Sequence, residues 1–170
     1  MRFLLIVGTT ASLATGILQG QQLGIGGGVT LPQGDLNAGT NQGWHALGSL
    51  MFGSPMQPMG LRVDVHHTRL PFTGALDGNS SVTSATLNLS YRLLRATAQV
   101  SPYVIAGLGA YRTACSDDLC EAQIRYGWNA GGGFLFRVAG LQAFLEGRFH
   151  RTTIRGEDVH FFPVTLGFRL

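Results

Sequence analysis

The sequence predicts an all-β fold, an antiparallel up-and-down barrel of eight strands. From Gln21 onward, apolar residues alternate with polar or small ones at a period of two, as in strands whose two faces meet different surroundings. Glycine supplies 25 of the 170 residues. Charged residues make up only 12% of the chain, whereas an average soluble domain has about 25%. No long run with a helical period of 3.6 residues competes with the strand pattern.

Residues 1–20 stand apart from this pattern and are interpreted as a secretory signal peptide. Arg2 gives a positive start, and an uncharged, mostly apolar stretch follows it. We expect cleavage before Gln21, with a site after residues 14–16 as the second option. A membrane-spanning helix is the alternative, but a span needs about 20 apolar residues, and threonines, serine and glycine interrupt this stretch. The predicted barrel then comprises residues 21–170.

Eight alternating runs follow, and all but the longer sixth run are close to the roughly 9 to 11 residues that a tilted strand needs to cross a bilayer. They cover residues 23–31, 44–53, 61–70, 85–94, 103–112, 124–138, 141–150 and 162–170. In the fourth run, Leu87 and Leu89 alternate cleanly with polar neighbours, whereas the fifth run is rich in glycine and hard to orient. An even number of strands returns both termini of the chain to the same side, as in bacterial membrane barrels.

The connections between the runs fall into two classes. Those expected on the outer side hold most of the acidic and turn residues and cover residues 32–43, 71–81, 113–122 and 151–158. The inner connections cover residues 54–60, 95–102 and 139–140. Membrane barrels have long outer loops and short periplasmic turns. In this sequence, only the inner connection at residues 139–140 is clearly shorter than the outer ones.

The direction in which the apolar face points decides between two kinds of barrel. A soluble barrel such as a lipocalin encloses its apolar residues, whereas a membrane barrel turns them outward. Here the glycines and most charged residues share the polar face, and together they would fill an eight-stranded lumen, which is only wide enough for side chains. All twelve basic residues are arginine and none is lysine, which favours lipid outside. We therefore predict a transmembrane barrel, with a soluble periplasmic ligand carrier as the alternative.

Aromatic residues lie near the ends of the runs, where membrane barrels carry interfacial girdles. The expected girdle residues are Trp44, Phe52, Tyr91, Tyr103, Tyr111, Tyr126, Phe149 and Phe162.

Several segments of the chain resemble the small eight-stranded outer-membrane barrels of the OmpA/OmpX type. They are Leu23–Asp35, Pro102–Tyr111, Asn129–Phe134, Phe144–His150 and the terminal alternating strand. The resemblance implies contact with outer-membrane lipid and lipopolysaccharide, and insertion by the outer-membrane assembly machinery. Such chains usually end on an aromatic residue that serves as a sorting signal. This chain ends on Leu170, with Phe168 two residues earlier.

Five charged residues are candidates for a network in the lumen: Arg62, Asp64, Arg92, Glu146 and Arg148. The third run carries the first two and the seventh run carries the last two, and these runs lie opposite each other in an eight-stranded barrel. An isolated buried charge costs several kcal/mol, so we expect opposite charges to pair. The pairs either plug the lumen or, as the resemblance implies, form a gate whose re-pairing opens a narrow conductance.

Cys115 and Cys120 are the only cysteines of the chain. In an exported protein, an even pair favours a disulfide. We predict that it closes an outer loop, with free thiols or intermolecular pairing as alternatives.

The sequence argues against several classes of function. A net charge of +3 without a basic cluster does not provide the positive patch that nucleic-acid binding needs. The five histidines lack the spacing of a strong metal motif, so no metal or cofactor is expected. His150-Arg151-Thr152, with Glu146 on the same face, resembles the His-x-Ser element of lipid A deacylases only weakly, because threonine replaces the nucleophilic serine.

We therefore predict a monomeric, non-enzymatic outer-membrane barrel. It would maintain the envelope or present its outer loops to a partner that the sequence does not identify. The main alternative is a narrow channel for ions or a small solute. A soluble ligand carrier and a lipid-modifying barrel enzyme are further alternatives.

Overall fold

The computed structural model describes most of the predicted barrel. The described residues are 21–34, 36, 39–54, 57–73, 78–94, 99–115, 122–138, 140–154 and 157–170. The predicted signal peptide, residues 1–20, lies outside them and stays a prediction. Within these ranges, no helix is long and apolar enough to cross a membrane.

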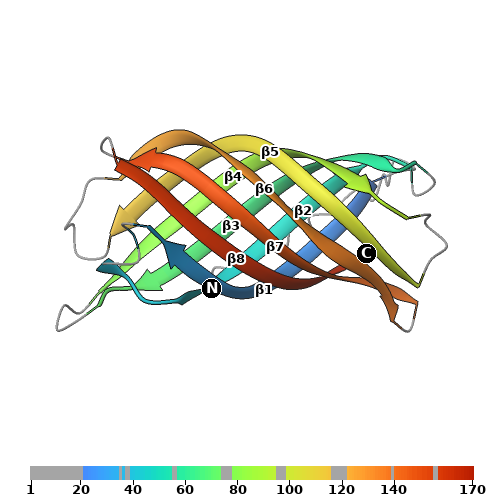
Figure 1. Cartoon of the computed structure of the whole chain (residues 1–170), viewed down its shortest axis with the longest axis horizontal. Helices are drawn as coiled ribbons and strands as arrows, with labels where there is room; N and C mark the ends of the chain where they lie inside the picture. Colours follow the sequence, from blue (N-terminus) through green and yellow to red (C-terminus); the bar gives the residue numbers. More distant parts are fainter. Residues whose placement is uncertain are drawn as a thin grey trace, which may run out of the picture.

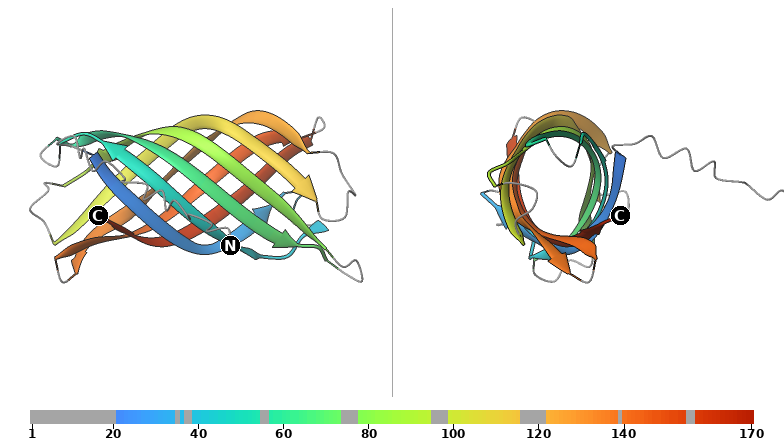
Figure 2. Two further views of the ribbon diagram at one scale, coloured as in Figure 1. Left: turned by 180° about the vertical axis from the view of Figure 1, so that it is seen from behind. Right: turned by 90° about the vertical axis from the view of Figure 1, so that its right-hand side faces the viewer.

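The described chain forms eight strands that close into one antiparallel barrel (Figure 1). They are β1 (Gln21–Gln33), β2 (Gly43–Phe52), β3 (Met59–Pro71), β4 (Asn79–Arg92), β5 (Val100–Cys115), β6 (Gln123–Val138), β7 (Leu141–Ile154) and β8 (Glu157–Arg169). Each strand pairs with its neighbours in the sequence, and β1 pairs with β8 to complete the ring seen end-on in Figure 2. This arrangement confirms the predicted fold class.

Both ends of the strand sequence lie at the same end of the barrel. Gln21 pairs with Phe52, and Leu170 exchanges backbone hydrogen bonds with Leu23. The connections after β2, β4 and β6 also lie at this end, which we call the turn end. The opposite end, where the connections after β1, β3, β5 and β7 lie, is the loop end.

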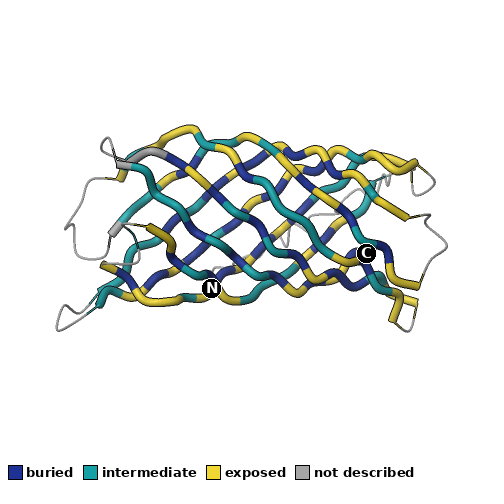
Figure 3. Tube along the Cα trace, viewed as in Figure 1, coloured by how far each residue is buried: buried dark blue, intermediate teal, exposed yellow. Residues whose placement is uncertain are grey.

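Burial alternates along the strands (Figure 3). In β4, Asn88 is fully buried, while its neighbours Leu87 and Leu89 are 53% and 50% exposed. In β7, Glu146 is buried and Leu145 is exposed. Large apolar side chains therefore point outward and polar ones inward, which confirms the predicted orientation. A soluble ligand carrier needs the opposite arrangement.

Glycines on the inner faces make room for large side chains in the lumen. A Cβ atom on Gly167 would lie 2.4 Å from Cζ of Phe144, and one on Gly107 would lie 2.1 Å from Oδ1 of Asn88. Both distances are too short for real contacts. Phe144 and Asn88 are fully buried, so the narrow barrel interior is packed with side chains, as expected for eight strands.

The expected aromatic girdle is correct for some residues and wrong for two. Trp44, Tyr91 and Tyr126 are exposed near strand ends. Tyr103 and Tyr111 instead point into the lumen, where they are 2% and 1% exposed. The glycine-rich β5 gave no clear apolar parity, so the sequence did not show that these two residues share the inward face.

Candidate functional site in the barrel lumen

Four charged residues from opposite walls meet in the middle of the lumen. Arg62 contacts Asp64 (Nε to Oδ1, 3.0 Å) and Glu146 (Nη2 to Oε1, 2.7 Å). Arg148 contacts the same two carboxylates (Nη1 to Asp64 Oδ2 and Nε to Glu146 Oε1, both 2.9 Å). Each guanidinium thus bridges both acids in a ring of formal charge zero. We call these four residues the lumen ion-pair ring.

The lumen ion-pair ring closes the lumen at its level. None of its four side chains exposes more than 2% of its surface, so water does not reach them from either end. Charges withdrawn from water in this way are retained only when they are paired and hydrogen-bonded. The structure therefore brings together four of the five charged residues that the sequence proposed for this network.

Arg92, the fifth proposed member, does not join the ring. Its guanidinium donates to the backbone carbonyl of Gln57 at the turn end. The β3–β4 register places Asn88 directly opposite Arg62. Arg92 follows four residues later on β4, which is roughly 13 Å along a strand. Its inclusion in the network was wrong because the sequence gave its parity but not its height in the barrel.

Neutral side chains that the sequence reasoning missed add hydrogen bonds to the ring, although Nη1 of Arg62 has no hydrogen-bond partner in the described structure. Asn88 donates through Nδ2 to Asp64 Oδ2 (3.0 Å) and accepts from Asn129 through Oδ1 (2.9 Å). The Tyr103 hydroxyl donates to Oε2 of Glu146 (2.5 Å). Asn88 shares the parity of the polar face and could have been found by its place between Leu87 and Leu89. No comparable signal marked Tyr103.

A stack of imidazole rings lies between the ion-pair ring and the loop end. The ring centroids of His45 and His66 are 4.6 Å apart, and those of His66 and His150 are 5.7 Å apart. His150 also stacks on Phe161 at 4.8 Å. All three histidines are buried. The alternation of the sequence places His66 and His150 on the inward face, but it did not show that His45 stacks with them.

His45 is hydrogen-bonded at both ring nitrogens, to the hydroxyls of Thr30 and Thr165 (both 2.9 Å), whereas, among the described residues, His66 and His150 are each bonded only at Nδ1. Nδ1 of His66 pairs with the Thr68 hydroxyl (3.1 Å), and Nδ1 of His150 pairs with the Tyr111 hydroxyl (3.0 Å). The Nε2 atoms of both rings are buried without a hydrogen-bond partner in the described structure. Among all the residues that the structure describes, no group of three or more His, Cys, Asp or Glu side chains is arranged to hold a metal ion.

The weak resemblance to a deacylase element gains no support from the local contacts. Thr152 is buried and donates its hydroxyl to the backbone carbonyl of Tyr126 (3.3 Å). The Nδ1 atom of His150 is engaged by Tyr111. Nucleophilic catalysis needs the hydroxyl hydrogen-bonded to its base, and no such bond links Thr152 to His150 among the described contacts.

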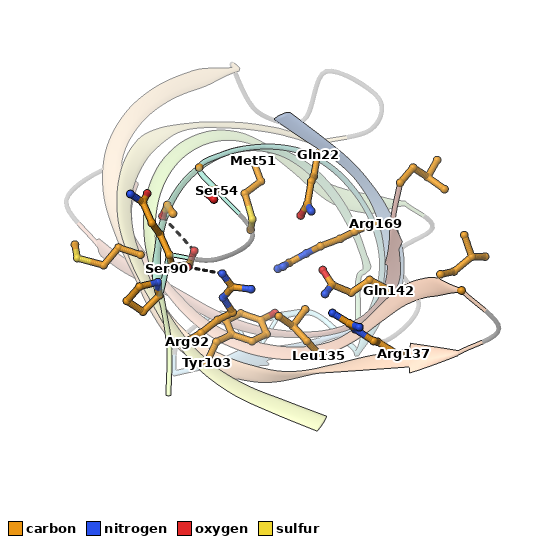
Figure 4. A pocket seen from close by; sticks show the side chains of 18 residues that line it. Gln22, Met51, Ser54, Ser90, Arg92, Tyr103, Leu135, Arg137, Gln142 and Arg169 are labelled. Atoms are coloured by element: carbon orange, nitrogen blue, oxygen red, sulfur yellow. Dashed lines mark hydrogen bonds between the residues drawn. The ribbon is translucent and has the colours of Figure 1, made fainter. Parts of the chain in front are cut away.

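A second feature, the mouth cavity, opens at the turn end with a volume of about 370 Å³ (Figure 4). Its lining includes Arg92, Arg137 and Arg169, together with Gln22 and Gln142. Tyr103 also lines the cavity. Its hydroxyl donates to Glu146, so this residue lies between the cavity and the ion-pair ring.

Two other proposed features have different outcomes. The predicted disulfide lies outside the described residues, because Cys120 is not described and nothing is established for the Cys115 side chain. Phe168 and Leu170, which stand where the resemblance places a C-terminal sorting signal, both point outward. Phe168 lies on β8, which pairs with β1 and β7.

The closed ring of eight strands, the apolar exterior and the polar lumen define a class of fold, that of the small outer-membrane β-barrels. Solved structures of this class are similar to the chain. Neisserial surface protein A (NspA) matches with a TM-score of 0.67 and 15% identity, over 88% of this chain and 95% of that one. At this identity the likeness shows the fold, and it confirms the resemblance to OmpA/OmpX-type barrels at that level.

Two further structures agree with this comparison. Ail, the attachment invasion locus protein of Yersinia pestis, matches with a TM-score of 0.54 and 17% identity, over 90% of this chain and all (100%) of that one. The N-terminal β-barrel domain of Pseudomonas aeruginosa OprF matches with a TM-score of 0.53 and 14% identity, over 89% and 98% of the two chains. No protein-family model and no curated protein sequence matches the chain.

Proposed function

We propose that the protein is a closed barrel of the bacterial outer membrane with a structural or surface-interaction role. The observation that carries the proposal is the lumen ion-pair ring, whose four side chains are at most 2% exposed. A steady aqueous pathway would need water at this level. Non-enzymatic function is supported by the hydroxyl of Thr152, which donates to the backbone carbonyl of Tyr126 and not to a histidine base.

The apolar exterior supports the membrane location. Leu87, Val65 and Leu108 are among many large apolar side chains that are more than half exposed, and such a belt would be unfavourable in water. In a bilayer it would contact lipid and lipopolysaccharide, with the loop end outward and the short turns toward the periplasm. Export through a cleaved signal peptide (residues 1–20), insertion by the assembly machinery and a monomeric state belong to the same proposal.

Cell fractionation and gel migration test the membrane location. We expect the protein in the outer-membrane fraction, released only by detergent, and a band that migrates faster before boiling than after it. Recovery in the periplasm without detergent would refute the location.

The predicted disulfide between Cys115 and Cys120 has its own test. A thiol in a disulfide does not react with an alkylating reagent, so we expect neither cysteine of the mature protein to be alkylated until a reductant is added.

Conductance measurement tests the closed lumen. The folded, purified protein is expected to give no steady current in planar bilayers. The observation that favours the second candidate, a gated narrow channel, is that each guanidinium of the ring contacts both carboxylates, so the pairs can be exchanged. Brief openings that increase in Glu146→Lys would support that gate, and a steady open current would refute a closed barrel.

A further inference from the structure

The mouth cavity differs from the ion-pair ring in its balance of charge. The ring pairs two arginines with two carboxylates. The 18 residues that line the mouth cavity include Arg92, Arg137 and Arg169 but no aspartate or glutamate. Figure 4 shows the guanidinium group of Arg169 pointing into the space between Gln22 and Gln142, while that of Arg92 lies across the cavity and donates to the carbonyl of Gln57. This end of the lumen therefore presents an excess of positive charge.

Arg169 gives the clearest sign of a missing ligand. It is only 7% exposed, and within the described chain no hydrogen bond or ion pair engages its guanidinium. Its close contacts are the ring faces of Tyr103 and Phe144, each 5.5 Å from its Cζ atom to the ring centroid. A ring face attracts a cation but carries no net negative charge and cannot neutralise it.

The carboxylates nearest in the lumen do not provide this neutralisation. Asp64 and Glu146 are each contacted by both Arg62 and Arg148. Tyr103 takes the remaining oxygen of Glu146. A buried arginine normally has a carboxylate or phosphate partner, because its desolvation is costly. An anion entering the mouth cavity would supply that partner.

We propose that the mouth cavity is a binding site for a phosphate group, a function that goes beyond that of a closed barrel and does not depend on it. A phosphate carries about −1.5 to −2 charges at neutral pH when it is a monoester, which suits a cavity with three arginines better than a single carboxylate does. Guanidinium groups bind phosphate oxygens through paired N–H donors. The amides of Gln22 and Gln142 and the hydroxyl of Ser54 line the same space and can donate to the remaining oxygens.

Two sources can supply the phosphate at the turn end. One is a free phosphate compound in the surrounding solution, and the other is the headgroup of a phospholipid in the adjacent leaflet. The apolar residues of the cavity wall, Met51, Leu135 and Leu141, are compatible with either source. Both sources offer phosphate oxygens to the arginines, but a phospholipid headgroup is a diester with one negative charge, so the experiment is designed to separate the two sources.

The test uses the full-length folded protein in micelles of an uncharged sugar detergent, which contains no phosphate. Isothermal titration calorimetry with inorganic pyrophosphate measures binding of the free anion, and titration with a short-chain phosphatidylglycerol measures binding of the headgroup. We expect at least one probe to bind saturably. Binding of pyrophosphate supports a free ligand, and binding of the lipid alone supports a headgroup site.

Matched charge-neutral variants tie the binding to the cavity. Arg169→Gln is expected to weaken binding by at least about tenfold, as for the loss of one charge-assisted hydrogen bond. Arg137→Gln, at the exposed rim, is expected to weaken it less. Arg125→Gln is the control, because Arg125 is exposed on β6 near the loop end and donates to Gln123. It removes the same charge and is expected to leave the affinity unchanged.

Gel migration before and after boiling shows whether each variant is folded. If Arg169→Gln does not fold, Arg169→Lys and Arg137→Gln provide the comparison, and both are expected to bind more weakly than the control. The proposal is overturned if neither probe binds saturably, or if the cavity variants and Arg125→Gln lose affinity equally. Equal losses would indicate a general effect of net charge.

Discussion

Replacing Glu146 by glutamine removes one charge from the lumen ion-pair ring with little change in volume. Its Oε1 atom accepts a hydrogen bond from Arg62 (2.7 Å) and forms an ion pair with Nε of Arg148 (2.9 Å), and its Oε2 atom accepts a hydrogen bond from Tyr103 (2.5 Å). The variant leaves two buried guanidinium groups facing a single carboxylate. Breaking a buried ion pair by removing one partner costs about 3–5 kcal/mol, so we expect Glu146→Gln to lower the free energy of unfolding by that amount.

Urea unfolding in phospholipid vesicles measures this loss, with the fluorescence of Trp44 and Trp128 as the signal. Both tryptophans lie on the outer surface of the barrel and leave the lipid when it unfolds. Asp158→Asn is the matched control, because it also removes one carboxylate from an ion pair. That pair, with Arg151, has side chains that are 46% and 40% exposed, and exposed pairs contribute about 0–1 kcal/mol.

A second variant separates charge balance from lost contacts. Glu146→Gln combined with Arg148→Met leaves Arg62 and Asp64 as one balanced pair. We expect the double variant to lose less stability than the sum of the two single variants, because contacting residues are not additive. The reasoning is refuted if Glu146→Gln costs no more than Asp158→Asn, or if the two losses in the ring simply add.

Two further predictions concern the packing of the lumen and the outer surface. Gly167→Ala would place a Cβ atom 2.4 Å from Cζ of Phe144 and should cost about 1–3 kcal/mol in the same unfolding assay, the usual range for overpacking. Gly48→Ala, whose Cβ atom would meet no atom within 4 Å, is the control, and equal effects would contradict a packed lumen. On the outer surface, Leu87→Arg near mid-strand should cost about 2–4 kcal/mol in lipid, whereas Leu93→Arg at the turn end should cost about 0–1 kcal/mol. Similar costs at both positions would argue against a bilayer around this belt.

The sequence by itself determined the number of strands, the orientation of their faces and the membrane-barrel class of fold. These features depend on local geometry, since successive side chains of a strand point to opposite faces. The alternation of Leu87 and Leu89 with their polar neighbours was therefore enough to place Asn88 inside. The same rule failed for Tyr103 and Tyr111, because the apolar parity of β5 is hidden by its glycines.

Only the tertiary structure decided which inward residues meet. The height of a residue in the lumen depends on the pairing register and on the closure of β1 against β8, both of which join residues far apart in the sequence. For this reason Arg62 and Arg148 share two carboxylates from opposite walls, whereas Arg92 lies at the turn end. The same closure buries Arg169 against two aromatic rings in a cavity lined by no aspartate or glutamate of the described chain, a position that its place on an alternating strand could not reveal.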